Sequence, residues 1–278
     1  MKNPNLNLWE IIIMDYIFNK LFVNEPQKKE NGIYYFGNEN DGDYFDEDNF
    51  DIWRNGGFIR NWRYKGFLEH NASRHLAEEI LNNNDYVIDL ACGPGMGFIP
   101  SVKQLNPMFP CMATDANPFV LSEWKEYLDN SEKYNKLSFA QFSVFDIPLK
   151  SNSVQAYSSF IGVSSTRSGE EGHAAALSEI RRTLAQGGTF YTVENEWTDV
   201  GAILDLFDKM GQQPWNGFDG KHITWHDKFI HNGFEIVYED PYYKSLRADD
   251  NELGEAAVKF GVDIGIKFTA FIVKKTKE

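Results

Sequence analysis

The feature that most restricts the fold of this chain is an alternation of short apolar segments with longer amphipathic ones, which begins at residue 85. The short segments are rich in β-branched and aromatic residues, as strands are, and the longer ones repeat apolar residues every three or four positions, as helices do. Strands that alternate with helices form a parallel sheet with helices packed on it. We predict strands at 85–90, 110–115, 137–143, 154–160, 188–194, 234–240 and 266–275.

The segments between these strands predict helices, at 100–106, 117–134, 169–186, 199–211 and 224–233. Gly187 and Gly233 follow two of them. Both are expected to end a helix, because glycine readily adopts the left-handed conformation found just past helix C-termini. No internal repeat interrupts the pattern, so residues 85–278 are predicted to form one α/β domain.

Residues 1–84 lack this alternation and are predicted to form an N-terminal helical and aromatic cap or lid. The opening segment is apolar, but Glu10 and Asp15 interrupt it, so it is expected to be an amphipathic helix and not a signal peptide or membrane span. Such a helix packs on the body or on a second subunit, which leaves a homodimer open. Residues 34–67 mix rings, acids and arginines, and they predict either an ordered surface loop or a lid over a ligand.

Charge and cysteine content exclude several classes of partner. The formal net charge of −14 opposes binding to nucleic acid and to anionic membrane surfaces. Cys92 and Cys111 show no ligand spacing, which favours a reducing, cytoplasmic setting without disulfides. His222 and His226 are four residues apart on an expected helix, but no third ligand accompanies them, so no metal is predicted.

The stretch VIDLACGPGMG, residues 87–97, joins the first predicted strand to the next helix. A tight turn needs glycine, and so does a cofactor that lies on the backbone. Gly93 and Gly95 would allow that approach, and Asp89 at the strand end can accept hydrogen bonds from an ammonium or hydroxyl group. Asp115 ends the second strand, where an acidic side chain can bind both hydroxyls of a ribose. Together the two features favour a nucleotide-like cofactor.

Five segments in order resemble the class I S-adenosylmethionine-dependent methyltransferases, in particular their broad small-molecule, type 11-like branch. VIDLACGPG is similar to the family's glycine motif and ATDANPFVL to its acidic second motif. FSVFDIPLKSNSVQAYSSF, ALSEIRRTLAQGGTFYTVE and KFIHNGFEIV are similar to its later segments. The resemblance implies S-adenosylmethionine as the cofactor. It also implies a Rossmann-like, doubly wound sheet of seven mostly parallel strands with the last strand antiparallel.

The resemblance also implies which residues hold the cofactor. Asp89 and the backbone of 91–95 would hold the methionine end, Asp115 the ribose and Ala116 the adenine face, with Phe160 near the transferred methyl group. Ala91 stands where the family most often has glycine, and Ser143 where it usually has aspartate. The expected cofactor-binding set is Asp89, Ala91, Cys92, Gly93, Gly95, Asp115, Ala116, Ser143, Val144, Phe145, Phe160 and, from the cap, Arg63.

The implied reaction is the in-line transfer of a sulfonium methyl group to an oxygen, nitrogen or carbon atom of a small molecule. A general base is optional, and the candidates are Glu194, Glu196, His173, Tyr44 and His70. Two alternatives stay open. One is a catalytically silent module that binds the cofactor or a protein. The weaker one is an NAD-dependent oxidoreductase, for which the third glycine of G-x-G-x-x-G would fall at Phe98.

Overall fold

The computed structural model describes residues 17–37, 72–95, 97–129, 136–166, 169–214, 223–250 and 252–276. The expected N-terminal helix and most of the aromatic segment 34–67 therefore lie outside the described residues. Glu10 and Asp15 lie in that expected helix, and Tyr44, Arg63, His70 and His222 also lie outside the described residues. A homodimer through the N-terminal helix stays a prediction.

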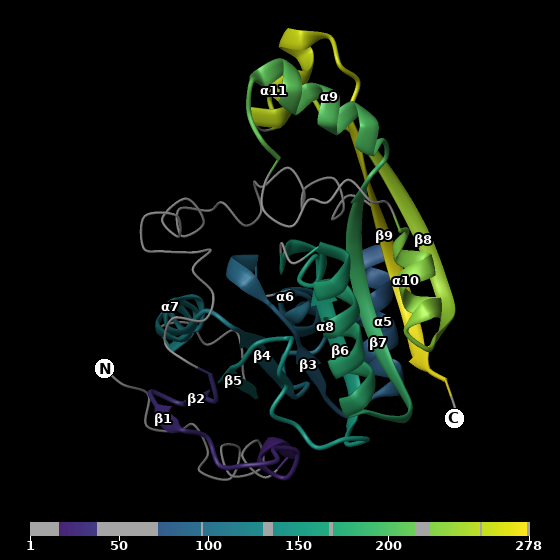
Figure 1. Ribbon diagram of the computed structural model, residues 1–278. Coiled ribbons are helices and arrows are strands. Elements are labelled where there is room, and N and C mark those ends of the chain that lie inside the picture. The colour runs from purple at the N-terminus through teal and green to yellow at the C-terminus, as the bar shows by residue number, and fades with distance from the viewer. Residues whose placement is uncertain are drawn as a thin grey trace.

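All seven predicted strands are present, and they belong to one sheet. They are β3 (Val87–Asp89), β4 (Cys111–Asp115), β5 (Leu137–Gln141), β6 (Val154–Phe160), β7 (Leu184–Trp197), β8 (Phe234–Ser245) and β9 (Gly265–Lys275). Their order is β5-β4-β3-β6-β7-β9-β8, and β9 is antiparallel to both of its neighbours while the other pairs are parallel. The strand order reverses between β3 and β6, which is where open α/β sheets bind ligands. The predicted fold class is confirmed (Figure 1).

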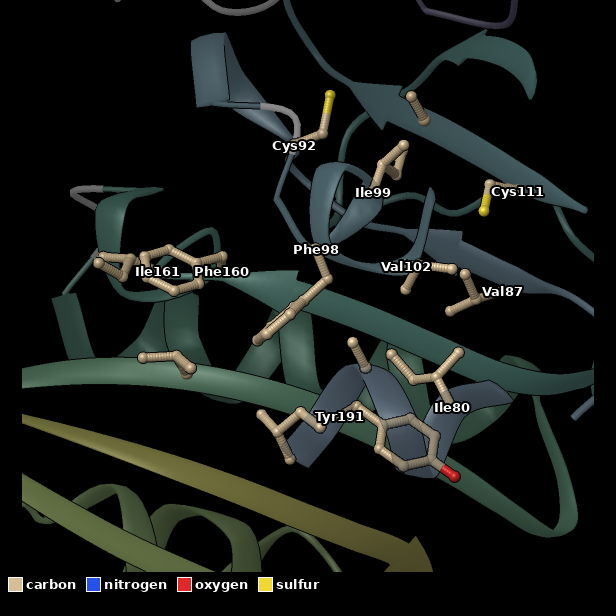
Figure 2. Close-up of a cluster of buried hydrophobic side chains, with 14 of the residues drawn as sticks. Ile80, Val87, Cys92, Phe98, Ile99, Val102, Cys111, Phe160, Ile161 and Tyr191 are labelled. Atoms are coloured by element: carbon tan, nitrogen blue, oxygen red, sulfur yellow. The ribbon is translucent and has the colours of Figure 1, made fainter. Parts of the chain in front are cut away.

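Helices cover both faces of the sheet. One apolar cluster packs α5 (Ala72–Asn83), α6 (Ile99–Leu105) and α7 (Pro118–Asp129) on the first face. A second cluster packs α8 (Gly169–Thr183) and α10 (Trp225–His231) on the other. Successive residues of β3 enter opposite clusters, because side chains alternate along a strand: Val87 lies in the first and Ile88 in the second. Figure 2 shows part of the first cluster, with Ile80 and Val102 beside Val87.

The C-terminal strands extend beyond the rest of the sheet and carry two helices. α9 (Val200–Met210) follows β7, and α11 (Glu252–Phe260) connects β8 to β9. A third apolar cluster joins them, with Ile203 and Leu206 from α9 and Ala257 from α11. In Figure 1 this α9–α11 unit lies beyond the end of β7. Because β7 is parallel to β6, and β6 to β3, the unit stands on the carboxyl side of the sheet.

Two further strands come from the N-terminal part of the chain, which brings the sheet to nine strands in the described residues. β2 (Ile33–Tyr35) pairs in parallel with β5, and β1 (Lys28–Glu30) pairs antiparallel with β2. Ile33 and Tyr34 are buried, and the ring of Phe22 stacks on Phe36 with centroids 4.4 Å apart. Strands of three residues carry too little periodicity to be read from sequence. The division of the chain at residue 84 stays a prediction.

The two expected helix ends have different outcomes. Gly233 follows Asn232, the C-cap of α10, and has a φ of 75°, as predicted. Gly187 also has a φ of 75°, but α8 already ends at Thr183, so the predicted position of this helix end was wrong. Gly187 lies inside β7, where the pairing with β6 shifts register, and its positive φ serves this irregularity in the strand.

Candidate active site

The glycine turn after β3 has an unusual density of left-handed backbone. Ala91, Gly93 and Gly97 have φ values of 47°, 55° and 52°. A Cβ atom built on Gly93 would meet no heavy atom of the described residues within 4 Å, so this part of the turn faces open space between them. The turn itself is fixed, because Cys92 N donates to Thr114 O at 2.8 Å and Trp124 Nε1 donates to Gly93 O at 3.3 Å.

Asp89 lies beneath this turn and is fully buried. Its Oδ2 accepts hydrogen bonds from the Ser158 hydroxyl and from Phe98 N, the latter at 3.0 Å, while Oδ1 has no hydrogen-bond partner among the residues that the structure describes. Burial raises the pKa of Asp89 to about 7, against the opposing effect of those two hydrogen bonds. A Cβ on Gly97 would lie within 3.0 Å of this carboxylate, so glycine is required there. The carboxylate thus supports the turn from below.

Asp115, at the end of β4, connects the glycine turn to a second turn, which follows β4 at residues 116–117. Its Oδ2 accepts from Gly93 N at 2.8 Å and its Oδ1 from Asn117 N at 2.9 Å. Burial raises the pKa of Asp115, and these amide hydrogen bonds oppose the shift. The residue as a whole is partly exposed, and each carboxylate oxygen has a second lone pair with which it can accept a further hydrogen bond.

The segment after β5 reaches the same edge. Phe142 N donates to Asp115 O at 3.1 Å, and Gln141 Nε2 donates to Ala116 O at 2.9 Å. Ser143 Oγ accepts from Phe145 N at 3.2 Å, and the Phe145 side chain is 39% exposed. The structure therefore brings the expected adenine-edge residues beside the second turn.

The end of β6 forms an apolar wall next to the glycine turn. The rings of Phe160 and Phe98 meet edge-on with centroids 5.5 Å apart, and both are buried (Figure 2). Gly162 follows, and a Cβ on it would lie within 3.0 Å of the carbonyl oxygens of Leu90 and Ala91. The backbone after β6 is thus in close contact with the backbone of the glycine turn.

Two of the candidate bases lie between the sheet and the helices α8 and α10. Glu194 of β7 is fully buried, and its carboxylate accepts hydrogen bonds from Thr192 Oγ1 at 2.7 Å and Ser164 N at 2.9 Å. His173 Nδ1 lies 3.1 Å from Lys228 Nζ, which lies 3.1 Å from Glu170 Oε1. Burial raises the pKa of Glu194 to about 7.

The described residues of the expected cofactor set gather at the carboxyl ends of β3, β4, β5 and β6. Sequence reasoning missed the partners that hold this edge together. They are Gly97, Trp124, Ser158, Gly162 and Lys228. Gly97 belongs to the quoted glycine stretch and was within reach of sequence analysis. The roles of the others depend on contacts between distant segments, which leave no local pattern.

The described residues also bear on metal binding and on membrane spans. Among them, no group of three histidine, cysteine, aspartate or glutamate side chains is arranged to hold a metal ion. No helix in the ranges given above combines the length and the apolar character needed to cross a bilayer.

Comparison with known proteins identifies the central part of the chain. Residues 88–192 match the family model described as a methyltransferase domain, Methyltransf_11. This range contains the glycine turn, Asp115 and the strands β4 to β6. No curated protein matches the sequence.

Solved structures share the fold at low sequence identity. The MccD protein aligns with a TM-score of 0.51 and 15% identity, over 73% of this chain and 96% of its own. A SAM-dependent methyltransferase from Methanosarcina mazei aligns with a TM-score of 0.51 and 16% identity, over 72% of this chain and 97% of its own. At this level of sequence identity, both comparisons show a shared fold.

Proposed function

We propose that this chain, whose residues 88–192 form a class I S-adenosylmethionine-dependent methyltransferase domain, transfers a methyl group to a small-molecule acceptor. The observation that carries the proposal is the joining of the glycine turn to Asp115 by the hydrogen bond from Gly93 N. This bond sets an open backbone turn and the carboxylate of a partly exposed residue side by side, as a nucleoside with an attached amino acid requires.

The residues present fit S-adenosylmethionine. The open space over Gly93 leaves room for a ligand on the turn, and the carboxylate of the partly exposed Asp115 retains acceptor capacity for ribose hydroxyls. Asp89 Oδ1 is a buried acceptor without a partner in the described part of the chain, and it offers negative charge below the turn for a ligand with an ammonium and a sulfonium. A cation there would offset the burial that raises the pKa of Asp89.

The assignment of residues follows the order of the strands. The backbone of 91–95, including Cys92 and Gly95, would hold the methionine end above Asp89. Asp115 would bind the ribose, and Ala116 with 143–145 would enclose the adenine. Phe160 would lie near the reacting methyl group. Arg63, outside the described residues, is proposed to bind the carboxylate of the cofactor.

The cofactor supplies an activated methyl group, and the protein supplies alignment and a dry surface. Phe98 and Phe160 form a buried apolar wall beside the turn, which excludes water from one side of the site. A base is needed where the acceptor is a hydroxyl or an ammonium group. His173 and Tyr44 stay candidates for that role.

The acceptor is proposed to be a small molecule that enters beneath the α9–α11 unit. This unit stands on the carboxyl side of the sheet, has its own apolar cluster and lies outside residues 88–192. Parts of a chain outside a shared domain are where substrate choice can differ between its relatives. The two free, buried cysteines suit a reducing compartment, and we propose the cytoplasm.

Titration calorimetry with S-adenosylmethionine and with its demethylated product tests the proposal. We expect micromolar binding of both, and no binding of either at millimolar concentration would contradict it. A panel of acceptors with labelled cofactor then distinguishes an enzyme from a silent binding module, which would bind without transfer. Fluorescence of bound NADH would favour the oxidoreductase.

A further inference from the structure

The segment 161–166 connects β6 to α8 and is a compact turn. Ser165 N donates to Ile161 O at 3.0 Å, and Thr166 N donates to Val163 O at 3.2 Å. Its first residue is attached to the neighbouring strand, because Ile161 N donates to Val193 O of β7 at 2.7 Å. The start of the segment is therefore attached to β7.

Gly162 brings this segment against the glycine turn. A Cβ on Gly162 would lie within 3.0 Å of Leu90 O and Ala91 O, so the two backbones are in van der Waals contact. Ile161 adopts a φ of 60°, which a β-branched residue rarely does, so the surrounding contacts must hold it there. A displacement of the segment 161–166 would therefore change the contact between Gly162 and the backbone of Ala91.

Glu194 provides the second attachment of this segment to β7. Its Oε2 accepts from Ser164 N at 2.9 Å, and its other oxygen accepts from Thr192 Oγ1 at 2.7 Å. The side chain is fully buried, and hydrogen bonds to a charged acceptor are about twice as strong as neutral ones. Loss of the charge would weaken the attachment at Ser164.

The charged groups around Glu194 come from the two helices packed on this face. Lys228 of α10 is the cation whose charge favours the ionised form of Glu194. Lys228 itself bonds to Glu170 and His173 of α8, and its ammonium lies 4.5 Å from the ring centroid of Trp225. Burial outweighs these influences and raises the pKa of Glu194 to about 7, so both protonation states are populated near neutral pH.

We infer that Glu194 is a positioning residue for methyl transfer: its carboxylate holds the segment 161–166 against the glycine turn and so fixes the wall along which the acceptor approaches. This inference rests on the proposed function and assigns Glu194 a role other than that of a base. The carboxylate is fully buried. It acts through Ser164 and Gly162 on the backbone of Ala91.

The test compares Glu194→Gln with the wild-type chain and with Glu239→Gln. The first variant keeps the shape of the side chain and removes its charge. The second makes the same change in a carboxylate that bonds to His226 of α10 from the outer strand β8, with no contact to 161–166 in the described structure. Thermal denaturation establishes that all three are folded. The Ser164 amide is then followed by NMR from pH 5.5 to 8.5, and S-adenosylmethionine affinity is measured by calorimetry over the same range.

We expect the Ser164 amide resonance to titrate with a midpoint near 7 in the wild type and in Glu239→Gln, and not in Glu194→Gln. Above pH 8, Glu194→Gln should bind S-adenosylmethionine roughly two- to thirtyfold more weakly, the range for residues that act through intervening contacts. An untitrated Ser164 amide, or equal affinity in both variants, overturns the inference while the proposed function stands. Failure of the wild type to bind S-adenosylmethionine overturns both, and it is seen before any variant is compared.

Discussion

At the scale of single residues, Gly93 and Gly97 share a backbone conformation and differ in what surrounds them. Both have positive φ, so an alanine at either position carries a conformational cost of about 1–2 kcal/mol. Gly93 faces open space, whereas Gly97 lies against the carboxylate of Asp89. Gly93 therefore leaves room for a ligand, whereas Gly97 is needed for the packing of the turn on Asp89.

This difference predicts that the alanine variant at Gly97 mainly loses stability and the one at Gly93 mainly loses cofactor affinity. Gly97→Ala should lower the free energy of unfolding by about 2–4 kcal/mol, because the new methyl group collides with a buried carboxylate. Gly93→Ala should cost only about 1 kcal/mol in stability and weaken cofactor binding at least about tenfold, since its methyl group enters the ligand space. Urea denaturation and calorimetry measure the two quantities. Equal stability of the two variants would contradict the packing around Gly97.

Asp89→Asn should separate stability from binding. Removing a buried charge whose pKa is raised to about 7 should increase the free energy of unfolding at pH 8 by at least about 1 kcal/mol. The same change should weaken S-adenosylmethionine binding at least about tenfold, because the negative charge below the turn is lost. Asp205→Asn, at an exposed ion pair on α9, is the control and should change neither property measurably. Unchanged affinity in Asp89→Asn would rule out its role below the cofactor.

Sequence reasoning found the residues that follow strand ends and missed those that act across the fold. Asp89, Gly93 and Asp115 were predicted because each occupies a fixed place in a strand–turn–helix unit. Ser158 and Lys228 were not, because each contacts a partner far away in the chain. The burial of Glu194 was also missed, since an acidic residue at a strand end is ordinarily solvated.

At the scale of elements, the α9–α11 unit is packed separately from the sheet. Its cluster contains residues from both helices together with Leu246 and Ile264, which flank α11. Trp197 of β7 packs against this cluster and against the first apolar cluster, on the face of the sheet that α5 covers. It therefore links the two clusters. The periodicity of the sequence predicted α9, but no helix was predicted where α11 lies, because nine residues between two long strands gave no clear pattern.

Weakening the α9–α11 unit should therefore leave the cofactor turn intact. Leu206→Ala removes a fully buried side chain and should cost about 2–4 kcal/mol locally. Hydrogen exchange should accelerate in α9 and α11, while S-adenosylmethionine affinity stays within about twofold of the wild type. Leu204→Ala, on the same helix but 41% exposed, is the matched control and should behave as the wild type. Faster exchange of β3 and β4 in Leu206→Ala would show that the unit is not separate.

At the scale of the whole molecule, three acids with raised pKa values make stability depend on pH. Asp89, Asp115 and Glu194 have raised pKa values in the folded chain, so the folded state binds more protons than the unfolded state over the range in which they titrate. Stability must then fall as pH rises through that range. Glu179, whose pKa is lowered by its bond to Arg182, has the opposite effect, but only as pH falls below its ordinary value of 4.5.

We therefore expect the free energy of unfolding to decrease from pH 5 to pH 7 and to level off above about pH 8. Urea denaturation at half-unit intervals measures this dependence. The double variant Asp89→Asn, Glu194→Gln should show a flatter profile, because two of the three groups no longer titrate. Stability that rises between pH 5 and 7 would contradict the burial of these carboxyls.

The fold as a whole was predicted more fully than its edges. Long, strongly patterned segments such as β6 and β9 were placed to within a residue or so, and β7 and β8 were found but extend beyond the predicted ends. The strands β1 and β2 were missed, because β2 pairs with β5, more than a hundred positions away, and β1 joins the sheet through β2.

The pairing of β2 with β5 has a consequence for how this chain can be cut. Residues 85–278 contain every strand of the matched domain, yet in that fragment β5 becomes an open edge without Ile33 and Tyr34, and the first face of the sheet also loses the buried side chains of α5. Open apolar edges recruit other chains. We expect a fragment that starts at residue 85 to aggregate in size-exclusion chromatography and one that starts at residue 17 to stay dispersed, and equal behaviour would support a division at 84. The part of the chain that resembles the family would then be shorter than the part that must be present for a stable fold.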